Sequence, residues 1–272
     1  MTILGGPVKS FSESFLKKIG CHFVSISCVQ KLIGIGEENV FIFSGFLVEV
    51  RDVWFYVTAG HIIRDVKESL EKGAKFDVWR LGDQTAGNKY RAAIPYAFDI
   101  NKWYIIEDKD LGFDYAVIQM DMIYCMQLKA GGAVPIQKAA WGDHRLKYDQ
   151  WALVGIPSET VKYDQETILS CKIAIVPINP TEEPPVSGSQ ADNRFYARLK
   201  DLGNLGDIDG MSGGPIFGLR WVEDWCEYKV IGVQSGWYRG AKTITVSPFK
   251  YLGVKLETLV ESAGLRKQSE KN

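Results

Sequence analysis

Residues 40–59 of the chain have the sequence VFIFSGFLVEVRDVWFYVTA. Apolar and aromatic residues fill two runs, 40–50 and 53–59, and the polar pair Arg51-Asp52 separates them. Two β-prone runs joined by two polar residues are typical of a β-hairpin. We therefore expect antiparallel β structure in this part of the chain.

Short runs of the same kind recur along the rest of the chain, with Gly, Asn and Asp in many of the gaps. They cover residues 22–30, 74–80, 90–94, 103–107, 115–120, 151–155, 167–176, 194–199, 215–219, 229–235 and 243–247. Many short strands with few helices indicate an all-β sandwich or barrel.

Helical spacing occurs near the two ends. Phe11, Phe15 and Leu16 predict a short N-terminal helix. An amphipathic C-terminal helix is predicted by apolar residues at i, i+3 and i+4, which are Phe249, Leu252, Leu256, Leu259 and Val260. Residues 127–150 are irregular and are expected to connect two halves, and residues 180–192 are expected to form a surface loop.

Composition excludes several classes of function. The chain has 272 residues, of which 46% are hydrophobic, and 32 basic residues balance 33 acidic ones. A net charge of -1 gives no electrostatic reason to expect nucleic acid or an anionic membrane as a partner. His22, His61 and His144 lie far apart and no Cys-x-x-Cys occurs, so we expect no metal and no cofactor.

The five cysteines are odd in number and widely spaced, which does not suggest a disulfide framework. Residues 1–10 lack the apolar segment of a signal peptide, and no run approaches the roughly 18 apolar residues of a membrane span. We therefore expect a cytoplasmic protein with reduced thiols, held together by its core.

Three segments carry residues suited to catalysis. His61 follows the apolar run 53–59, and Asp114 lies at the head of the apolar run 113–118. Ser212 lies in the sequence GMSGGP, residues 210–215. A serine hydroxyl needs a base to take its proton, an imidazole titrates near neutral pH, and a carboxylate fixes the imidazole tautomer. Gly210 and Ser212 could supply the backbone N–H groups that stabilise an oxyanion.

Each of these residues alone is commonly structural: the histidine a packing residue, the aspartate a cap, and the glycine-rich run a turn. Their occurrence together in the order His, Asp, Ser is that of chymotrypsin and differs from the order in subtilisin or the α/β-hydrolases. Over residues 20–264 the chain resembles the trypsin-like serine peptidases. Residues 43–48 and 54–62 resemble the hairpin that leads to the base, and residues 230–237 resemble the strand that pairs with the substrate backbone.

The resemblance implies two six-stranded antiparallel β-barrels with the triad between them. The implied organisation is an N-terminal helical extension (1–19), a first barrel with His61 and Asp114 (20–126), a linker (127–150), a second barrel with Ser212 (151–248) and a C-terminal helix with a tail (249–272).

The implied activity is that of a serine endopeptidase, which cleaves protein or peptide substrates through an acyl-enzyme. Carried over residue by residue, the resemblance assigns Ser235, Gly236 and Trp237 to substrate binding, Gly206 to the base of the primary specificity pocket, and Asp207 to a position beside it. An acidic pocket would favour Arg or Lys before the cleaved bond, whereas Trp237 and the next residue, a tyrosine, could narrow the pocket in favour of small or apolar side chains.

The chain departs from the secreted members of this family. Ser44 and Ile62 stand where many of them have a disulfide, and Met211 replaces the aspartate that pairs with a newly cut N-terminus. Activation by N-terminal cleavage is therefore not expected, and control could come from a misformed oxyanion loop, an occluding segment or a regulatory protein partner. Candidate segments are the N-terminal helix and residues 180–192 and 220–228, where Trp221 and Trp225 have the spacing of one helical face or of core residues.

Two other functions are compatible with the sequence. One is an inactive trypsin-fold module that binds protein without cleaving it. The other is a β-protein in which the three motifs coincide by chance. A nucleotide-binding enzyme is disfavoured because Gly34-x-Gly36 lacks the third glycine and the following helix.

Overall fold

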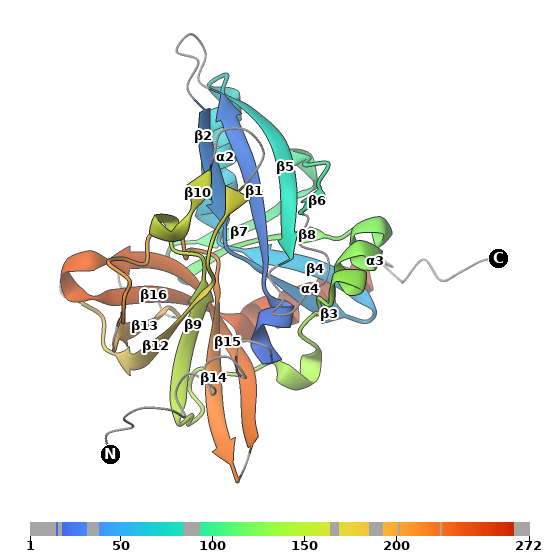
Figure 1. Ribbon diagram of the computed structural model, residues 1–272. Coiled ribbons are helices and arrows are strands. Elements are labelled where there is room, and N and C mark those ends of the chain that lie inside the picture. Colours follow the sequence, from blue (N-terminus) through green and yellow to red (C-terminus); the bar gives the residue numbers. More distant parts are fainter. Residues whose placement is uncertain are drawn as a thin grey trace.

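A computed structural model describes residues 15, 18–31, 38–83, 93–163, 169–184, 193–200, 202–223 and 225–263 of the chain. Most of the expected N-terminal helix (10–18), much of the expected loop 180–192 and the tail after residue 263 lie outside these residues. Figure 1 shows the first half of the chain as blue and green strands and the second half as yellow to red strands.

The first half forms two four-stranded antiparallel sheets. The first has the order β2 (Glu38–Phe43), β1 (Val24–Lys31), β5 (Lys75–Asp83), β6 (Ile94–Pro95). The second has the order β3 (Phe46–Val50), β4 (Val53–Thr58), β8 (Phe113–Gln119), β7 (Tyr104–Asp108). Val24 and Leu81 from the first sheet and Leu47 and Ile118 from the second are buried in one core between them.

The hairpin predicted at Arg51-Asp52 is confirmed. Both residues have positive φ, 51° and 67°, as a two-residue turn between right-twisted strands requires. The single run predicted over residues 40–50 is wrong, because the chain leaves one sheet at Phe43 and enters the other at Phe46. The break falls at Ser44, whose hydroxyl bonds to the second half of the chain instead of to a strand neighbour.

The second half forms a closed six-stranded antiparallel barrel. Its strand order is β12 (Ala174–Thr181), β13 (Phe195–Leu199), β16 (Thr243–Pro248), β15 (Trp225–Tyr238), β14 (Pro215–Val222) and β9 (Gln150–Gly155). A short hairpin of β10 (Lys162–Tyr163) and β11 (Leu169–Ser170) lies outside the barrel ladder. Leu153, Ile178, Ile216, Ile231 and Val246 are among the side chains that fill the barrel.

The prediction of two closed barrels is met in the second half alone. In the described part of the first half, an isolated bridge between Phe23 and Phe46 joins the two sheets, and no strand ladder closes them into a ring. The two sheets instead bury their apolar faces against each other, so these faces are removed from water although the sheets do not form a closed barrel. A mostly β architecture with one closed barrel is compatible with the trypsin-like resemblance.

Three α-helices are described: α2 (Gly60–Glu71), α3 (Met122–Gly131) and α4 (Phe249–Ser262). Short 3₁₀ helices are η1 (Gly20–His22), η2 (Ile100–Lys102), η3 (Lys138–Ala140), η4 (Ser158–Thr160) and η5 (Arg239–Ala241). The C-terminal helix is confirmed. α2 and α3 were not predicted from the sequence, and α3 extends into the segment expected to be irregular.

The segment around Trp221 also differs from its prediction. Trp221 and Trp225 lie in the hairpin of β14 and β15, not on a helix, and the Trp221 side chain is 44% exposed, so it is not a core residue.

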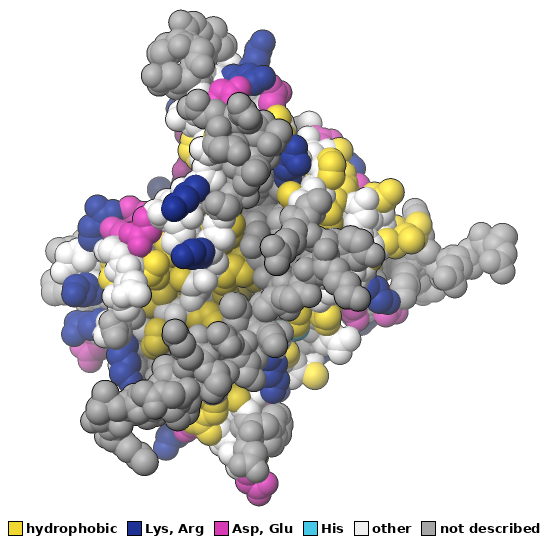
Figure 2. Space-filling view, viewed as in Figure 1, with side chains coloured by type: hydrophobic (Ala, Val, Ile, Leu, Met, Phe, Trp, Pro, Cys, Tyr) yellow, Lys and Arg dark blue, Asp and Glu magenta, His cyan; other side chains and the backbone are white. Residues whose placement is uncertain are grey.

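On the face shown in Figure 2, basic and acidic side chains are interspersed around apolar ones.

The two halves share a buried core. Val57 and Tyr115 from the first half lie in one cluster with Val154, Phe217 and Phe249 from the second. The hydroxyl of Tyr115 donates to the carbonyl of Pro248 at 2.6 Å within this cluster. The ends of β4 and β8 are thereby held against the second-half barrel, and this is where the candidate site lies.

All five cysteines are free thiols, so the described fold rests on its core and hydrogen bonds. None of the described helices combines the length and apolar character needed to cross a bilayer.

Candidate active site

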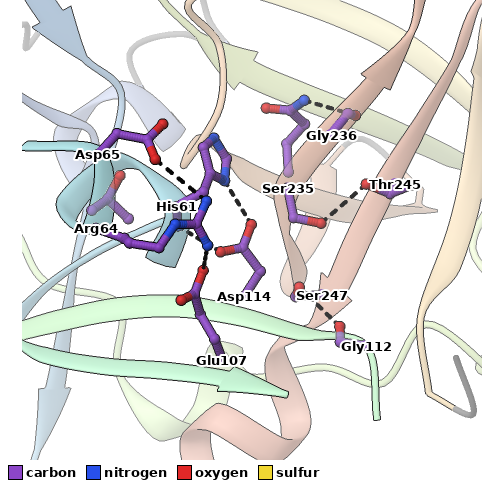
Figure 3. Close-up of polar contacts among 12 residues, drawn as sticks. His61, Arg64, Asp65, Glu107, Gly112, Asp114, Ser235, Gly236, Thr245 and Ser247 are labelled. Atoms are coloured by element: carbon purple, nitrogen blue, oxygen red, sulfur yellow. Dashed lines mark hydrogen bonds and ion pairs between the residues drawn. The ribbon is translucent and has the colours of Figure 1, made fainter. Parts of the chain in front are cut away.

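His61 and Asp114 are brought together by strand pairing. β4 pairs with β8 up to Thr58 and Ala116, so the start of α2 lies beside the start of β8. Asp114 is buried and accepts two hydrogen bonds from His61: Oδ1 from the backbone N–H at 2.7 Å, and Oδ2 from the ring Nδ1 at 2.7 Å. Figure 3 shows the His61 ring directed at Asp114. Two bonds fix both the position of the residue and the rotation of its ring.

This arrangement determines the protonation of His61. With a carboxylate as acceptor, Nδ1 carries the proton, and Nε2 on the opposite side of the ring has its lone pair free to accept another. Burial of the ring opposes protonation, but the hydrogen bond and negative charge of Asp114 outweigh it and raise the pKa of His61 above its ordinary value. The pair is suited to accept a proton and to stabilise the resulting imidazolium.

Charged residues from α2 and β7 lie near the His61–Asp114 pair. Arg64 forms ion pairs with Glu107 and Asp65, and these three residues lie on one side of His61 in Figure 3. The charge of Asp65 raises the pKa of His61 and that of Arg64 lowers it, so their effects oppose each other. This group was not predicted from the sequence, because its members come together on α2, a helix that was not expected. There the i, i+3 and i+4 spacing places His61, Arg64 and Asp65 on one face.

Ser212 lies in a tight turn that packs against the end of β4. Gly213 has a φ of +85°, and a Cβ at this position would lie 2.0 Å from Oγ1 of Thr58 and 3.0 Å from the backbone nitrogen of Ala59. A glycine is therefore required there by both backbone conformation and close approach. Because Ala59 comes two residues before His61, this contact places the Ser212 turn next to the His61–Asp114 pair.

The Ser212 side chain is half-buried. Within the described part of the chain its hydroxyl makes no hydrogen bond, and none joins it to His61. Such bonds are often loose without substrate and tighten when the site is occupied. The three predicted residues thus lie close together. The hydrogen bond between His61 and Asp114 is formed, whereas one between Ser212 and His61 is not formed in the described structure.

The backbone of the turn leaves two donors uncommitted. The N–H groups of Met211, Gly213 and Gly214 donate to the carbonyls of Ile208, Gln234 and Met211. Those of Gly210 and Ser212 donate to no group of the described chain. These two were the donors predicted for an oxyanion.

Two contacts from outside the turn fix its peptides. The Ser158 N–H donates to the carbonyl of Asp209 at 2.7 Å, and Oγ of Ser44 donates to the carbonyl of Gly210 at 3.1 Å. A trans peptide directs its N–H opposite to its C=O, so anchoring the Asp209 carbonyl directs the Gly210 N–H away from η4. Met211 is fully buried in the barrel core, where its side chain anchors the turn without an ion pair.

The predicted substrate-binding residues of β15 run beside the same turn. The Gln234 carbonyl accepts from the Gly213 N–H at 2.9 Å, and the Gln234 N–H donates to the Gly214 carbonyl at 3.0 Å. The next residues are Ser235, whose hydroxyl bonds that of Thr245 at 3.2 Å, and Gly236, whose carbonyl accepts from the Gln234 side chain at 3.0 Å. Figure 3 shows Ser235 and Thr245 to the right of His61, with Asp65 on its left.

Gly206 and Asp207 precede the turn, and both are engaged. The Gly206 N–H donates to the carboxylate of Glu159 at 3.0 and 3.1 Å. Asp207 accepts from Nε1 of Trp237 at 2.9 Å and forms an ion pair with Nε of Arg239 at 2.6 Å. The carboxylate predicted to favour basic substrates is therefore already paired with an arginine of the chain.

Other candidate sites lie elsewhere. Within the described residues, no three His, Cys, Asp or Glu side chains form a group that could hold a metal ion. A surface pocket of about 390 Å³ is lined by residues that include Lys18, His22, Tyr228 and Lys229, none of which belongs to the predicted site.

No protein-family model matches the chain, and no curated protein sequence matches it. The assignment of a function therefore depends on the motifs and on the geometry of the site.

Proposed function

We propose that the protein is a trypsin-like serine endopeptidase with His61, Asp114 and Ser212 as its catalytic triad. The observation that carries the proposal is the two-point hydrogen bond of Asp114 to His61, beside the turn that holds Ser212. The uncommitted N–H groups of Gly210 and Ser212 support it further, because acyl transfer requires donors for a developing oxyanion.

In the proposed reaction, Oγ of Ser212 attacks the carbonyl carbon of the scissile peptide while Nε2 of His61 takes the hydroxyl proton. The N–H groups of Gly210 and Ser212 stabilise the oxyanion. When the intermediate collapses, the C–N bond breaks, and His61 gives the proton to the leaving amine. Water then attacks the acyl-enzyme with His61 as base, which releases the carboxylic acid and restores Ser212. Asp114 stays ionised and stabilises the imidazolium in both halves of the reaction.

The alternative is a catalytically inactive trypsin-fold module that binds protein. The lack of a hydrogen bond between Ser212 and His61 in the described structure favours this alternative. The uncommitted donors favour the peptidase, because a module without turnover has no use for them.

A fluorophosphonate probe tests the proposal, because it captures a serine whose hydroxyl is activated. We expect the wild-type chain to be labelled at Ser212, and Ser212→Ala and His61→Ala to be unlabelled while they keep the wild-type circular dichroism spectrum. Ser262→Ala, on the exposed side of α4, is the matched control and should be labelled like the wild type. A folded wild-type chain that remains unlabelled would support the inactive binding module.

The proposal extends to the wider expectations from the resemblance: a first half that corresponds to the first of two barrels, protein substrates, a cytoplasmic location and control by a partner. Mapping of new N-termini in cells that express the wild-type chain or Ser212→Ala tests the substrates and the location together. Cleavage sites that depend on Ser212 and fall in cytoplasmic proteins are the expected result.

A further inference from the structure

The position of the substrate side chain next to the scissile bond follows from the site geometry. The substrate carbonyl must lie at Oγ of Ser212 with its oxygen toward the N–H groups of Gly210 and Ser212. On one side the turn is in contact with Thr58 and Ala59 and leaves no room, since not even a Cβ fits at Gly213. On another side the turn is bonded to β15 through Gln234, and β15 is joined to the segment before the turn by the hydrogen bond from Trp237 to Asp207, so we place the adjacent side chain between these two segments.

Trp237 occupies that side. It lies in β15 three residues after Gln234, which is bonded to the Ser212 turn, and its cross-strand neighbour is the buried Ile244. The indole is partly buried against the barrel core, which also contains Ile208 and Met211. Its Nε1 donates to Oδ1 of Asp207 at 2.9 Å, so the ring bridges from β15 to the segment before the turn.

Asp207 is held in place by the same group. Its Oδ1 also accepts the N–H groups of Ile208 at 2.6 Å and Asp209 at 3.1 Å, and its Oδ2 pairs with Arg239. Arg239 forms a second ion pair with Asp209. Both oxygens of Asp207 are engaged by groups of the chain, one of them by the cation of Arg239, so neither is free to pair with a substrate cation.

We propose that Trp237, held by Asp207 and Arg239, fills the primary specificity pocket, so that the enzyme cleaves after Gly, Ala or Ser and not after large or basic residues. The proposal rests on the proposed peptidase function. It assigns Trp237 as the specificity-determining residue and Asp207 as its anchor, in place of the role of a receptor for Arg or Lys.

The test is cleavage of a diverse peptide library by the full chain, with products identified by mass spectrometry and fluorophosphonate labelling of Ser212 measured in parallel. We expect the wild type to be labelled and to cleave after Gly, Ala and Ser. A labelled wild type that cleaves after Arg, Lys, Phe or Leu would overturn the inference while leaving the proposed function intact. An unlabelled, inactive wild type would overturn both.

Variants distinguish the effect of Trp237 from that of the ion pair between Asp207 and Arg239. Trp237→Ala should raise kcat/KM for Leu or Phe before the cleaved bond by about tenfold or more, because an apolar space has opened, and should leave Arg and Lys excluded. Trp221→Ala, an exposed tryptophan of the same barrel, is the matched control and should keep the wild-type profile. Trp237→Ala combined with Arg239→Gln should add cleavage after Arg and Lys, because Asp207 loses its ion pair.

Arg239→Gln alone removes no part of the indole. The Arg239→Gln variant should therefore still not cleave after large residues if Trp237 fills the pocket. Profiles of Trp237→Ala and of the double variant identical to wild type, in labelled protein, would overturn the inference.

Discussion

Replacement of Asp114 by asparagine should remove most catalysis without removing the fold. His61 presents two donors to Asp114, its backbone N–H to Oδ1 and its Nδ1–H to Oδ2, both at 2.7 Å. An asparagine has one carbonyl oxygen and one NH₂ group, so it accepts from one of these donors alone. If the oxygen keeps the backbone N–H, the NH₂ group faces Nδ1 and favours the tautomer with its proton on Nε2.

That tautomer cannot accept the proton of Ser212. In trypsin-like enzymes the equivalent change lowers kcat by about 10⁴-fold, which corresponds to about 5 kcal/mol of activation free energy. Loss of one buried hydrogen-bond partner should lower the free energy of unfolding by about 1–3 kcal/mol.

The assay is kcat/KM against pH on a peptide that the wild type cleaves. Activity requires neutral His61, whose pKa Asp114 raises, so wild-type activity falls as the pH drops through this raised pKa. In Asp114→Asn the carboxylate that raises the pKa of His61 is absent, so the acid limb of the residual activity should lie at lower pH than in the wild type. Asp65→Asn removes an exposed carboxylate that makes no bond to the ring, and should stay within a few-fold of wild type. Parental activity in Asp114→Asn, with an unchanged acid limb, would refute the assignment of Asp114 as the orienting carboxylate.

Two further predictions concern the turn and the core. Gly213→Ala should abolish labelling of Ser212 and lower the melting temperature, because a Cβ clashes with Thr58 at a φ of +85°; Gly203→Ala, at a φ of +58° with open space around it, is the control for backbone strain and should keep labelling. His22 is buried, and burial lowers its pKa from 6.5 against the opposing effect of its bond to the Val134 carbonyl, so the unfolded chain binds the proton more readily. The free energy of unfolding should therefore fall as the pH decreases below about 6.5. Chemical denaturation of His22→Gln should show a weaker dependence of this free energy on pH in that range. An equal pH dependence in both proteins would contradict a lowered pKa of His22.

Local patterns in the sequence predicted the elements whose partners are near in the chain. The hairpin at Arg51-Asp52 follows from two apolar runs and a polar pair, and the face of α4 follows from apolar spacing that matches its buried Phe249, Leu252 and Leu256. Both signals involve residues close together in the chain, so they can be recognised without knowledge of the rest of the fold.

Elements that depend on distant contacts were not predictable in this way. α2 has few apolar residues. Ile62, Ile63 and Val66 form its buried face, and Ile62 and Ile63 pack in the core between the first-half sheets, a contact that no local pattern signals. The break at Ser44 has no strong local signal, because its cause is a pair of hydrogen bonds to Ile156 and Gly210 more than a hundred residues away. Closure of the second half into a barrel, which the described strands of the first half do not share, is likewise a property of strand pairing.

The sequence by itself determined which residue types are present for the proposed chemistry and their order, His61, Asp114 and Ser212, because motifs are local. Only the tertiary structure decided that Asp114 holds His61 at two points, because β4 and β8 must pair to bring them together. It also decided the state of Asp207. In the sequence this residue is a carboxylate suited to bind a basic side chain, whereas in the folded chain it pairs with Arg239 and accepts a hydrogen bond from Trp237. Electrostatic pairing depends on distance in space, and no spacing along the chain predicts it.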